Sequence, residues 1–244
     1  MPPDVSDCWR RAPRAAGAPI MTTSHDNPSH ANRLAEALIL ALEERGITDE
    51  RVLAAIAAVP RQAFVDPAHI EYAYEDQALP IACGQTISQP FVVAYMTQKL
   101  GLMPEHDVLE IGTGSGYQAA VLARLARHVY TIERHEPLLA EAVRRFQDLG
   151  IGQGLGISNI TAIAGDGSRG WPDARLFDRI IVTAAAREVP QALFDQLRPG
   201  GRMIMPLGAR LFRQRLVQFD KTADGMQTIN LLTVRFVPLV GGQG

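Results

Sequence analysis

A glycine-rich segment near the middle of the chain has the residue types and spacing of a ligand-binding loop. It follows a short apolar run and reads Glu110-Ile111-Gly112-Thr113-Gly114-Ser115-Gly116. Glycines where a strand turns into a helix let the backbone approach a ligand closely and expose the N–H groups of the helix N-terminus. The spacing does not match the dinucleotide motif G-x-G-x-x-G, because the last glycine comes one position early, and no lysine follows as in a phosphate-binding loop. An acid at Glu110 also suits a positively charged ligand better than a pyrophosphate.

Two more acids follow later apolar runs. Glu133 comes 21 residues after Gly112, where a carboxylate can accept hydrogen bonds from both hydroxyls of a ribose. Asp166, within Gly165-Asp166-Gly167, follows the next apolar run, at a place where an adenine edge would lie. Taken alone, an acid at either position is more often a solvent-exposed residue at the end of a strand. Three acids at the ends of consecutive strands, beside the glycines, favour S-adenosylmethionine, which carries an ammonium and a sulfonium and no phosphate.

The elements that would position these residues alternate along the chain from residue 107. Short apolar runs lie at 108–111, 129–132, 160–164, 179–182 and 202–205, and the clearest helical patterns lie at 117–126, 138–149 and 190–197. Buried strands that alternate with helices predict an α/β fold, Rossmann-like and doubly wound, with a mostly parallel sheet and helices on both faces. Later, residues 215–219 and 227–236 flank Asp224-Gly225 and predict a C-terminal antiparallel hairpin at one sheet edge.

The first hundred residues predict an N-terminal helical lobe. Apolar residues recur at helical spacing from Asn32 to a stop at Gly46. A second helix, with Thr48 as its N-cap, is expected to run through Val59. Residues 61–90 have no clean period and predict irregular structure, and a helix is expected at 91–100. We therefore expect a disordered extension over 1–31, a lobe over 32–104 and a cofactor-binding core over 105–244, with 32–244 forming one compact domain.

Composition excludes several other classes of protein. The chain has 244 residues, 26 acidic and 24 basic side chains and a net charge of −2, which gives no electrostatic case for a nucleic-acid or membrane partner. No apolar run approaches the ~20 residues that cross a bilayer. Two cysteines outside any C-x-x-C pair and six dispersed histidines predict no metal site. We expect a cytoplasmic monomer.

Motifs on both sides of the glycine segment carry a family resemblance over residues 32–239. They are Val59-Pro60-Arg61, Gly84-Gln85-Thr86-Ile87-Ser88-Gln89-Pro90, Gly165-Asp166-Gly167, Val182-Thr183-Ala184-Ala185, Pro206-Leu207-Gly208 and Phe236-Val237-Pro238-Leu239. Together with the glycine segment, this set resembles the protein-L-isoaspartate O-methyltransferases. The block at 84–90 is the specific part, because methyltransferases in general lack it. The resemblance implies methyl transfer from S-adenosylmethionine to the free carboxylate of isoaspartyl residues in damaged proteins, with S-adenosyl-L-homocysteine as the other product.

The same resemblance assigns roles to single residues. It makes Ser88 the active-site hydroxyl beside the substrate carboxylate. For the cofactor it implies contacts from Glu110, Gly112, Thr113, Gly114, Ser115, Gly116, Glu133, Asp166 and Gly167. For the substrate peptide it implies contacts from Thr86, Ile87, Thr183, Leu207, Gly208, Gln214, Val237 and Pro238.

A single hydroxyl is chemically sufficient for this reaction. An isoaspartyl carboxylate, with a pKa near ~4, is already ionised at pH 7 and needs no general base. Attack on a sulfonium methyl removes one negative and one positive charge, so an ionic clamp would stabilise the reactants more than the transition state. A neutral hydroxyl such as Ser88 orients the oxygen without that cost. Without the surrounding block, Ser88 would be read as a turn or N-cap serine.

Several alternatives stay open from the sequence. An NAD(P) oxidoreductase shares the fold class, but the glycine spacing and Glu110 argue against it. A methyltransferase for another substrate and a non-catalytic adaptor that binds S-adenosylmethionine are the other two. Residues 236–239 are either a strand edge that pairs with an extended peptide or a closing strand that only packs.

Overall fold

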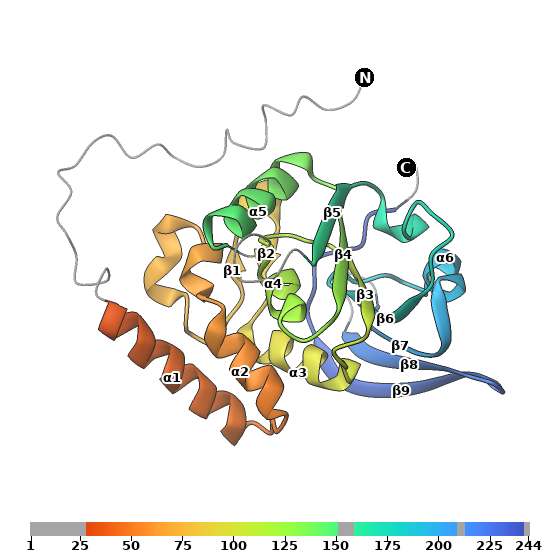
Figure 1. Cartoon of the computed structure of the whole chain (residues 1–244), viewed down its shortest axis with the longest axis horizontal. Coiled ribbons are helices and arrows are strands. Elements are labelled where there is room, and N and C mark those ends of the chain that lie inside the picture. The colour runs from red at the N-terminus through yellow and green to blue at the C-terminus, as the bar shows by residue number, and fades with distance from the viewer. Residues whose placement is uncertain (1–27, 151–158, 209–212, 242–244) are drawn as a thin grey trace.

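A seven-stranded sheet forms the centre of the protein (Figure 1). The computed structural model describes residues 28–150, 159–208 and 213–241. The strands are β3 (Asp107–Ile111), β4 (His128–Glu133), β5 (Ile160–Ala164), β6 (Phe177–Val182), β7 (Leu197–Leu207), β8 (Gln214–Thr222) and β9 (Gly225–Val234). Their order is β5-β4-β3-β6-β7-β8-β9; the first five are parallel, and β8 and β9 are antiparallel to their neighbours. The predicted fold class is confirmed, including the C-terminal hairpin.

The strand order places a crevice at the carboxyl ends of β3 and β6. These two strands are neighbours although two strands separate them in the sequence. From this point the chain winds toward β5 on one side and toward β7 on the other, and ligands in open α/β sheets bind at such a reversal. Ile111 pairs with Val182 at the ends of the two strands. The following residues, Gly112 and Thr183, therefore face each other across the crevice.

Helices cover both faces of the sheet unequally. The buried side chains form two clusters. Because successive side chains of a strand point to opposite faces of the sheet, Val108 belongs to one cluster and Leu109 to the other. The first cluster joins the sheet to α1 (Pro28–Glu44), α2 (Glu50–Ala58), α3 (Pro90–Leu100), α4 (Tyr117–Ala123) and α5 (Glu136–Asp148). The second lies under α6 (Gln191–Asp195) and the short helix η6 (Gly167–Arg169). Figure 1 shows α1, α2 and α3 together on the side away from α6.

The N-terminal lobe is built as predicted, with two corrections at helix starts. α1 begins at Pro28, four residues before the expected start at Asn32. The N-cap of α2 is Asp49 and not Thr48, because the Asp49 carboxylate accepts a hydrogen bond from the Arg51 N–H at 3.0 Å. The N–H groups of Thr48 and Asp49 both donate to Gln98 Oε1 on α3, at 2.7 and 2.8 Å. The expected extension lies outside the described residues up to position 27.

The irregular part of the lobe contains only short elements, as expected. They are η3 (Arg61–Phe64), η4 (Pro67–Tyr72), β1 (Leu79–Pro80), η5 (Ala82–Gly84) and β2 (Thr86–Ile87). β1 and β2 form a small antiparallel pair. This pair holds the Gln85–Ser88 segment next to the start of α3, at the edge of the crevice.

Three expected elements end earlier than predicted. The helix expected at 190–197 is α6, which ends at Asp195 because Leu197 already begins β7. α4 stops at Ala123 instead of 126, because the N–H groups of Arg124 and Leu125 bond three residues back and tighten the last turn. β9 ends at Val234, so residues 236–239 are not the end of the edge strand. Pro238 instead forms a parallel bridge with Ala185, whose N–H donates to Val237 O at 2.8 Å and whose carbonyl accepts from the Leu239 N–H at 2.7 Å. One edge of this segment is thus paired within the chain.

Candidate active site

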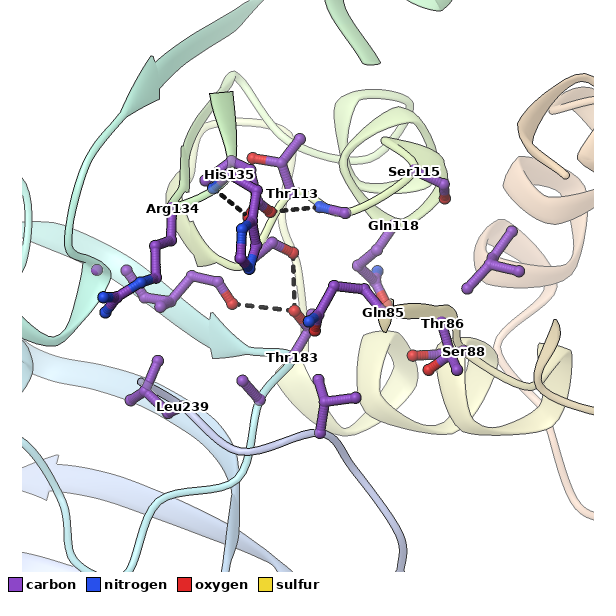
Figure 2. A pocket seen from close by; sticks show the side chains of 18 of the residues that line it. Gln85, Thr86, Ser88, Thr113, Ser115, Gln118, Arg134, His135, Thr183 and Leu239 are labelled. Atoms are coloured by element: carbon purple, nitrogen blue, oxygen red, sulfur yellow. Dashed lines mark hydrogen bonds between the residues drawn. The ribbon is translucent and has the colours of Figure 1, made fainter. Parts of the chain in front are cut away.

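A pocket opens at the carboxyl ends of the central strands, where the crevice was expected (Figure 2). Its wall is formed by the Gln85–Ser88 segment, the glycine loop with the start of α4, the β4–α5 connection, the residues after β6 and the C-terminal segment 237–240, together with Val93 and Gly167. The predicted residues among its lining are Thr86, Ile87, Ser88, Gly112, Thr113, Gly114, Ser115, Glu133, Gly167, Thr183, Val237 and Pro238. Folding therefore brings twelve of the predicted site residues to one cavity.

The glycine loop packs closely against the end of β6. Gly112 has φ +96°, and a Cβ placed there would lie 2.4 Å from Thr183 Oγ1. The Thr183 hydroxyl is fixed in this position, since it lies 3.0 Å from the Ile111 carbonyl oxygen and 2.7 Å from that of Gly112. Gly112 is therefore a position where the backbone conformation and the close approach both require glycine.

The N–H groups of the three glycines are already hydrogen-bonded within the protein. Gly112 N donates to Ile132 O at 2.9 Å, Gly114 N to Glu133 Oε2 at 2.8 Å and Gly116 N to Thr113 O at 2.9 Å. A phosphate-binding loop needs such N–H groups to point at the anion. This loop does not offer its glycine N–H groups to a pyrophosphate, which argues against a dinucleotide.

Glu133 is the acid best placed to contact a ligand. Its side chain is buried at the pocket wall, with Oε2 accepting from Gly114 N and Oε1 accepting from His135 N at 2.9 Å. Two backbone donors fix the carboxylate, and each oxygen keeps a second lone pair for a further donor. This arrangement fits a ligand that presents hydroxyl hydrogens, such as a ribose.

Glu110 lies behind the loop and does not line the pocket. Its side chain is fully buried, Oε2 accepts from the Thr131 hydroxyl at 2.5 Å, and Oε1 has no partner within the described residues. Since Thr131 donates to Glu110, the Thr113 hydroxyl at 2.6 Å must donate to Thr131. Thr113 does line the pocket, so Glu110 acts on it through two hydroxyl groups.

The pKa of the Glu110 carboxyl is raised to about 8, because burial penalises its charged form and the nearby Glu133 charge adds to the effect. In the unfolded chain the carboxyl ionises near its ordinary pKa of 4.5. The free energy of unfolding is therefore expected to fall between pH 4.5 and about 8, by on the order of a few kcal/mol, and to level off above that.

Glu110→Gln should remove this part of the pH dependence. Urea unfolding at pH 5, 6.5 and 8 measures it, with Glu105→Gln, an exposed carboxyl outside the site, as the matched control. We expect the Glu110→Gln curve to be flatter than those of the wild type and of Glu105→Gln. Three parallel curves would contradict a buried carboxyl that stays protonated in the folded state.

Gly116 and Asp166 shape the site from behind its surface, and Gly167 shapes it at the surface. Gly116 ends the loop as the N-cap of α4, and a Cβ there would lie 2.8 Å from the Phe146 ring. Asp166 caps η6, since Oδ1 accepts from the Ser168 N–H at 3.0 Å. Of these three residues Gly167 alone lines the pocket, and its Cβ would lie 2.4 Å from Ile111 Cγ2.

Ser88 lies at the opposite side of the pocket from the charged side chains. Figure 2 shows Ser88 and Thr86 well separated from Arg134 and His135. Ser88 is half-buried, and its hydroxyl makes no hydrogen bond within the described part of the chain. Its neighbours in the wall are neutral: Gln85, Thr86, Ile87, Val93 and Gln118. A carboxylate placed there would meet a hydroxyl and amides but no ion pair.

Three residues that were expected to contact the substrate lie behind the pocket wall. Gln214 holds the C-terminal segment, because Nε2 donates to Phe236 O at 3.1 Å and Oε1 accepts from Phe236 N at 2.5 Å. Leu207 forms a parallel β-bridge with Ala186, and the Gly208 N–H donates to the Ala186 carbonyl oxygen at 2.8 Å. None of the three lines the pocket. They support residues 185–186 and the segment 236–239, and this second segment carries Val237 and Pro238.

A family model for protein-L-isoaspartate(D-aspartate) O-methyltransferases matches residues 32–244. The chain belongs to this family. The protein-L-isoaspartate O-methyltransferase of Parvibaculum lavamentivorans is 56% identical over 208 residues, which cover 84% of this chain and 90% of that protein. The protein of the same name from Xanthobacter autotrophicus is 51% identical over 222 residues, which cover 91% and 98%.

A solved structure of the same family has the same architecture. The β-aspartate methyltransferase of Plasmodium falciparum, in complex with S-adenosyl-L-homocysteine, matches with a TM-score of 0.75 and 27% identity. The match covers 85% of this chain and 99% of that one. The family is S-adenosylmethionine-dependent, which agrees with the loop and acids described above.

Sequence reasoning about this methyltransferase missed several residues of the pocket wall. Arg134 and His135 directly follow Glu133, so their adjacency was a usable signal. Gln118 lies in the first turn of α4, one residue after Tyr117, and could have been found by extending the motif. Val240 gave no signal: it reaches the wall because its carbonyl accepts from Arg134 Nη1 at 2.7 Å.

Two kinds of feature are absent from the described residues. No group of histidine, cysteine, aspartate and glutamate side chains there has the arrangement of a metal site. Within the same residues, no helix combines the length and apolar character needed to cross a bilayer.

Proposed function

We propose that this protein transfers a methyl group from S-adenosylmethionine to the free carboxylate of L-isoaspartyl residues in damaged proteins and peptides. The observation that carries the proposal is one pocket with two chemically different ends. One end has a fixed carboxylate and a tight glycine loop, and the other has the Ser88 hydroxyl among neutral side chains.

The acid and loop end is assigned to the cofactor. Glu133 would hold the ribose, Gly112 to Gly114 the methionine part and Gly167 the adenine. When bound, S-adenosylmethionine supplies a methyl group activated by a positively charged sulfur. The chain contributes shape and hydrogen-bond acceptors, and the internally bonded glycine N–H groups leave the loop unsuited to phosphates.

The Ser88 end is assigned to the substrate carboxylate. This group is ionised at neutral pH and is already nucleophilic, so Ser88 needs only to donate a hydrogen bond that orients the oxygen. A carboxylate oxygen forms a bond to the methyl carbon while the carbon–sulfur bond breaks and its electron pair stays on sulfur. The charges cancel in this step, which explains why neutral side chains around Ser88 are an advantage. Alignment of the two reactants then supplies most of the acceleration.

The methyl ester makes the repair possible. The neighbouring backbone nitrogen attacks the ester carbonyl, loses its proton and expels methanol, which gives a succinimide. Water can open this ring toward normal aspartate.

Val237 and Pro238 are proposed to contact the peptide at the mouth of the pocket. The pairing of this segment with Ala185 supports the idea, because it fixes the two residues in the pocket wall. Two cysteines in 244 residues suit a reducing compartment, so we also propose a cytoplasmic location.

Methyl transfer from labelled cofactor to two matched peptides tests the proposed function. The peptides have one sequence and differ only in having aspartate or isoaspartate at one position. We expect label in the isoaspartyl peptide alone, with release of methanol as the ester decays. Equal labelling of both peptides, or no labelling, would reject the assignment.

A further inference from the structure

A fully buried arginine lies directly behind Ser88. Arg61, in η3, is 0% exposed. Its Nε donates to Ala73 O at 2.8 Å, and its Nη2 donates to Ser88 O at 2.7 Å. The guanidinium carbon lies 4.8 Å from the centre of the Tyr117 ring, in the first turn of α4. Arg61 therefore joins the lobe, the Ser88 segment and the glycine-loop helix at one point.

This arginine is costly to bury and has no carboxylate partner within the described residues. A buried charge is normally compensated by an opposite charge, and removing water from a guanidinium is expensive. Burial lowers the Arg61 pKa, and the phenol groups of Tyr117 and Tyr74 only partly offset the effect. Nη1 has no hydrogen-bond partner in the described part of the chain. A residue kept only for stability would more simply be apolar at this place.

A second clamp holds the residues that follow Ser88. The Asp76 carboxylate accepts from Gln89 Nε2 at 2.9 Å and from the Phe91 N–H at 2.8 Å. Asp76 also forms an ion pair with Arg45, whose guanidinium stacks 3.8 Å above the Phe91 ring. The Phe91 N–H belongs to the first turn of α3, where Gln89 gives no side-chain cap. Asp76 thus caps this helix from a distant part of the lobe.

The two clamps fix the backbone on the C-terminal side of Ser88. A hydrogen bond to the Ser88 carbonyl fixes the plane of the peptide bond between Ser88 and Gln89. The bonds to Asp76 hold the side chain of Gln89 and the backbone N–H of Phe91. With these bonds in place, the Ser88 hydroxyl is the part of the residue left to face the pocket.

We propose that Arg61 is a positioning residue for the Ser88 hydroxyl, and that Asp76 completes the same clamp. The inference rests on the proposed function, because it assigns Arg61 a role through the group that orients the substrate carboxylate. Arg61 does not line the pocket and is not a catalytic residue. Its positive charge stays on the carbonyl side of Ser88, so the carboxylate meets only the neutral hydroxyl.

Arg61→Lys tests whether the guanidinium must donate to both carbonyl oxygens at once. Lysine keeps the charge, but its single ammonium cannot reproduce the planar geometry that reaches two carbonyl oxygens. We expect kcat/KM for an isoaspartyl peptide to fall about 10-fold, through kcat, because small displacements of a positioning group cost up to ~100-fold in rate. The Kd for S-adenosyl-L-homocysteine is expected to change less than about 2-fold, a difference well under 1 kcal/mol.

A double-mutant cycle with Ser88→Ala separates positioning from general structural support. If Arg61 acts through the Ser88 hydroxyl, Arg61→Lys should cost less than about 2-fold once that hydroxyl is absent. A residue that only supports the fold would cost the same factor in both backgrounds. Asp76→Asn, measured in the same cycle, should show the same coupling, and it tests the clamp if Arg61→Lys fails to fold.

Arg179→Lys is the matched control. Arg179 is also partly buried and donates to main-chain carbonyls, at 2.8 Å to Leu100 O, but it lies outside the pocket. We expect a loss in kcat/KM under about 2-fold in either background. Equal losses from a clamp variant with and without Ser88, or full activity of Ser88→Ala, would overturn the inference while the function stands. A wild-type protein that does not label the isoaspartyl peptide would remove the function and this inference together.

Discussion

Gly112→Ala is expected to lower the affinity for S-adenosylmethionine by at least about 100-fold, close to complete loss of measurable binding. The new Cβ would lie 2.4 Å from Thr183 Oγ1, on a residue with φ +96°. The left-handed conformation alone costs roughly 1–2 kcal/mol for a residue with a Cβ. The threonine cannot rotate away without breaking its contacts to two carbonyl oxygens. The loop must therefore move, and a loss of about 2.7 kcal/mol in binding is enough for the 100-fold effect.

Calorimetric titration with S-adenosyl-L-homocysteine measures this effect, and Gly46→Ala provides a close control. Gly46 has φ +92°, nearly the value of Gly112, but a Cβ there would meet nothing within 4 Å. Both variants should lose similar stability from backbone strain, whereas Gly112→Ala alone should lose binding. Adding Thr183→Ala to Gly112→Ala removes the clashing oxygen and should restore part of the affinity. Normal binding by Gly112→Ala would show that the loop does not contact the cofactor.

The fold was predictable because its signals are local. The five parallel strands came from apolar runs, and the Asp224-Gly225 turn located the hairpin between β8 and β9. Errors fell where tertiary contacts decide an element's end. Thr48 is a reasonable N-cap in isolation, but Gln98 Oε1 of α3 accepts from the N–H groups of both Thr48 and Asp49 and sets where the helix starts, and the Asp49 side chain caps it. In the same way, Pro238 lies outside the edge strand, because it forms a bridge with Ala185.

Sequence patterns could predict residues that line the pocket, but not which residues lie behind the wall and hold it in place. Motif residues such as Gly112, Glu133 and Ser88 do meet at one pocket. The sequence could not separate residues that line the pocket from those that act behind it, since both occur in the same motifs. Glu110 belongs to the glycine motif yet lies buried behind Thr131. The clamp on Ser88 involves a residue 27 positions away in the chain, Arg61, which no local pattern connects to it.

The charge distribution in the pocket explains how one site serves two unlike reactants. Among the described wall residues, Glu133, Arg134 and His135 all come from the β4–α5 connection. The described residues of the wall on the Ser88 side are neutral. A cofactor that keeps its adenosine fixed benefits from charged and buried acceptors at one end. A reaction that cancels charge benefits from their absence at the other.

Ser88→Ala tests the neutral end directly. We expect kcat/KM for an isoaspartyl peptide to fall about 10- to 200-fold, which corresponds to the ~1.5–3 kcal/mol of a hydrogen bond to a charged group. The Kd for S-adenosyl-L-homocysteine should stay within about 2-fold of the wild-type value, because Ser88 lies across the pocket from Arg134 and His135 (Figure 2). Stopped reactions with labelled cofactor, run below the KM for the peptide, measure the ratio of rates.

The conservative variant Ser88→Thr keeps the hydroxyl and serves as the matched comparison. Its β-branched side chain limits the hydroxyl to fewer orientations, so its activity should lie between those of Ser88→Ala and the wild type. A neutral residue that orients a carboxylate is expected to act on the peptide reaction and leave cofactor binding unchanged. If Ser88→Ala weakened cofactor binding as much as it slowed methyl transfer, the serine would belong to the cofactor end, and the division of the pocket into two ends would be wrong.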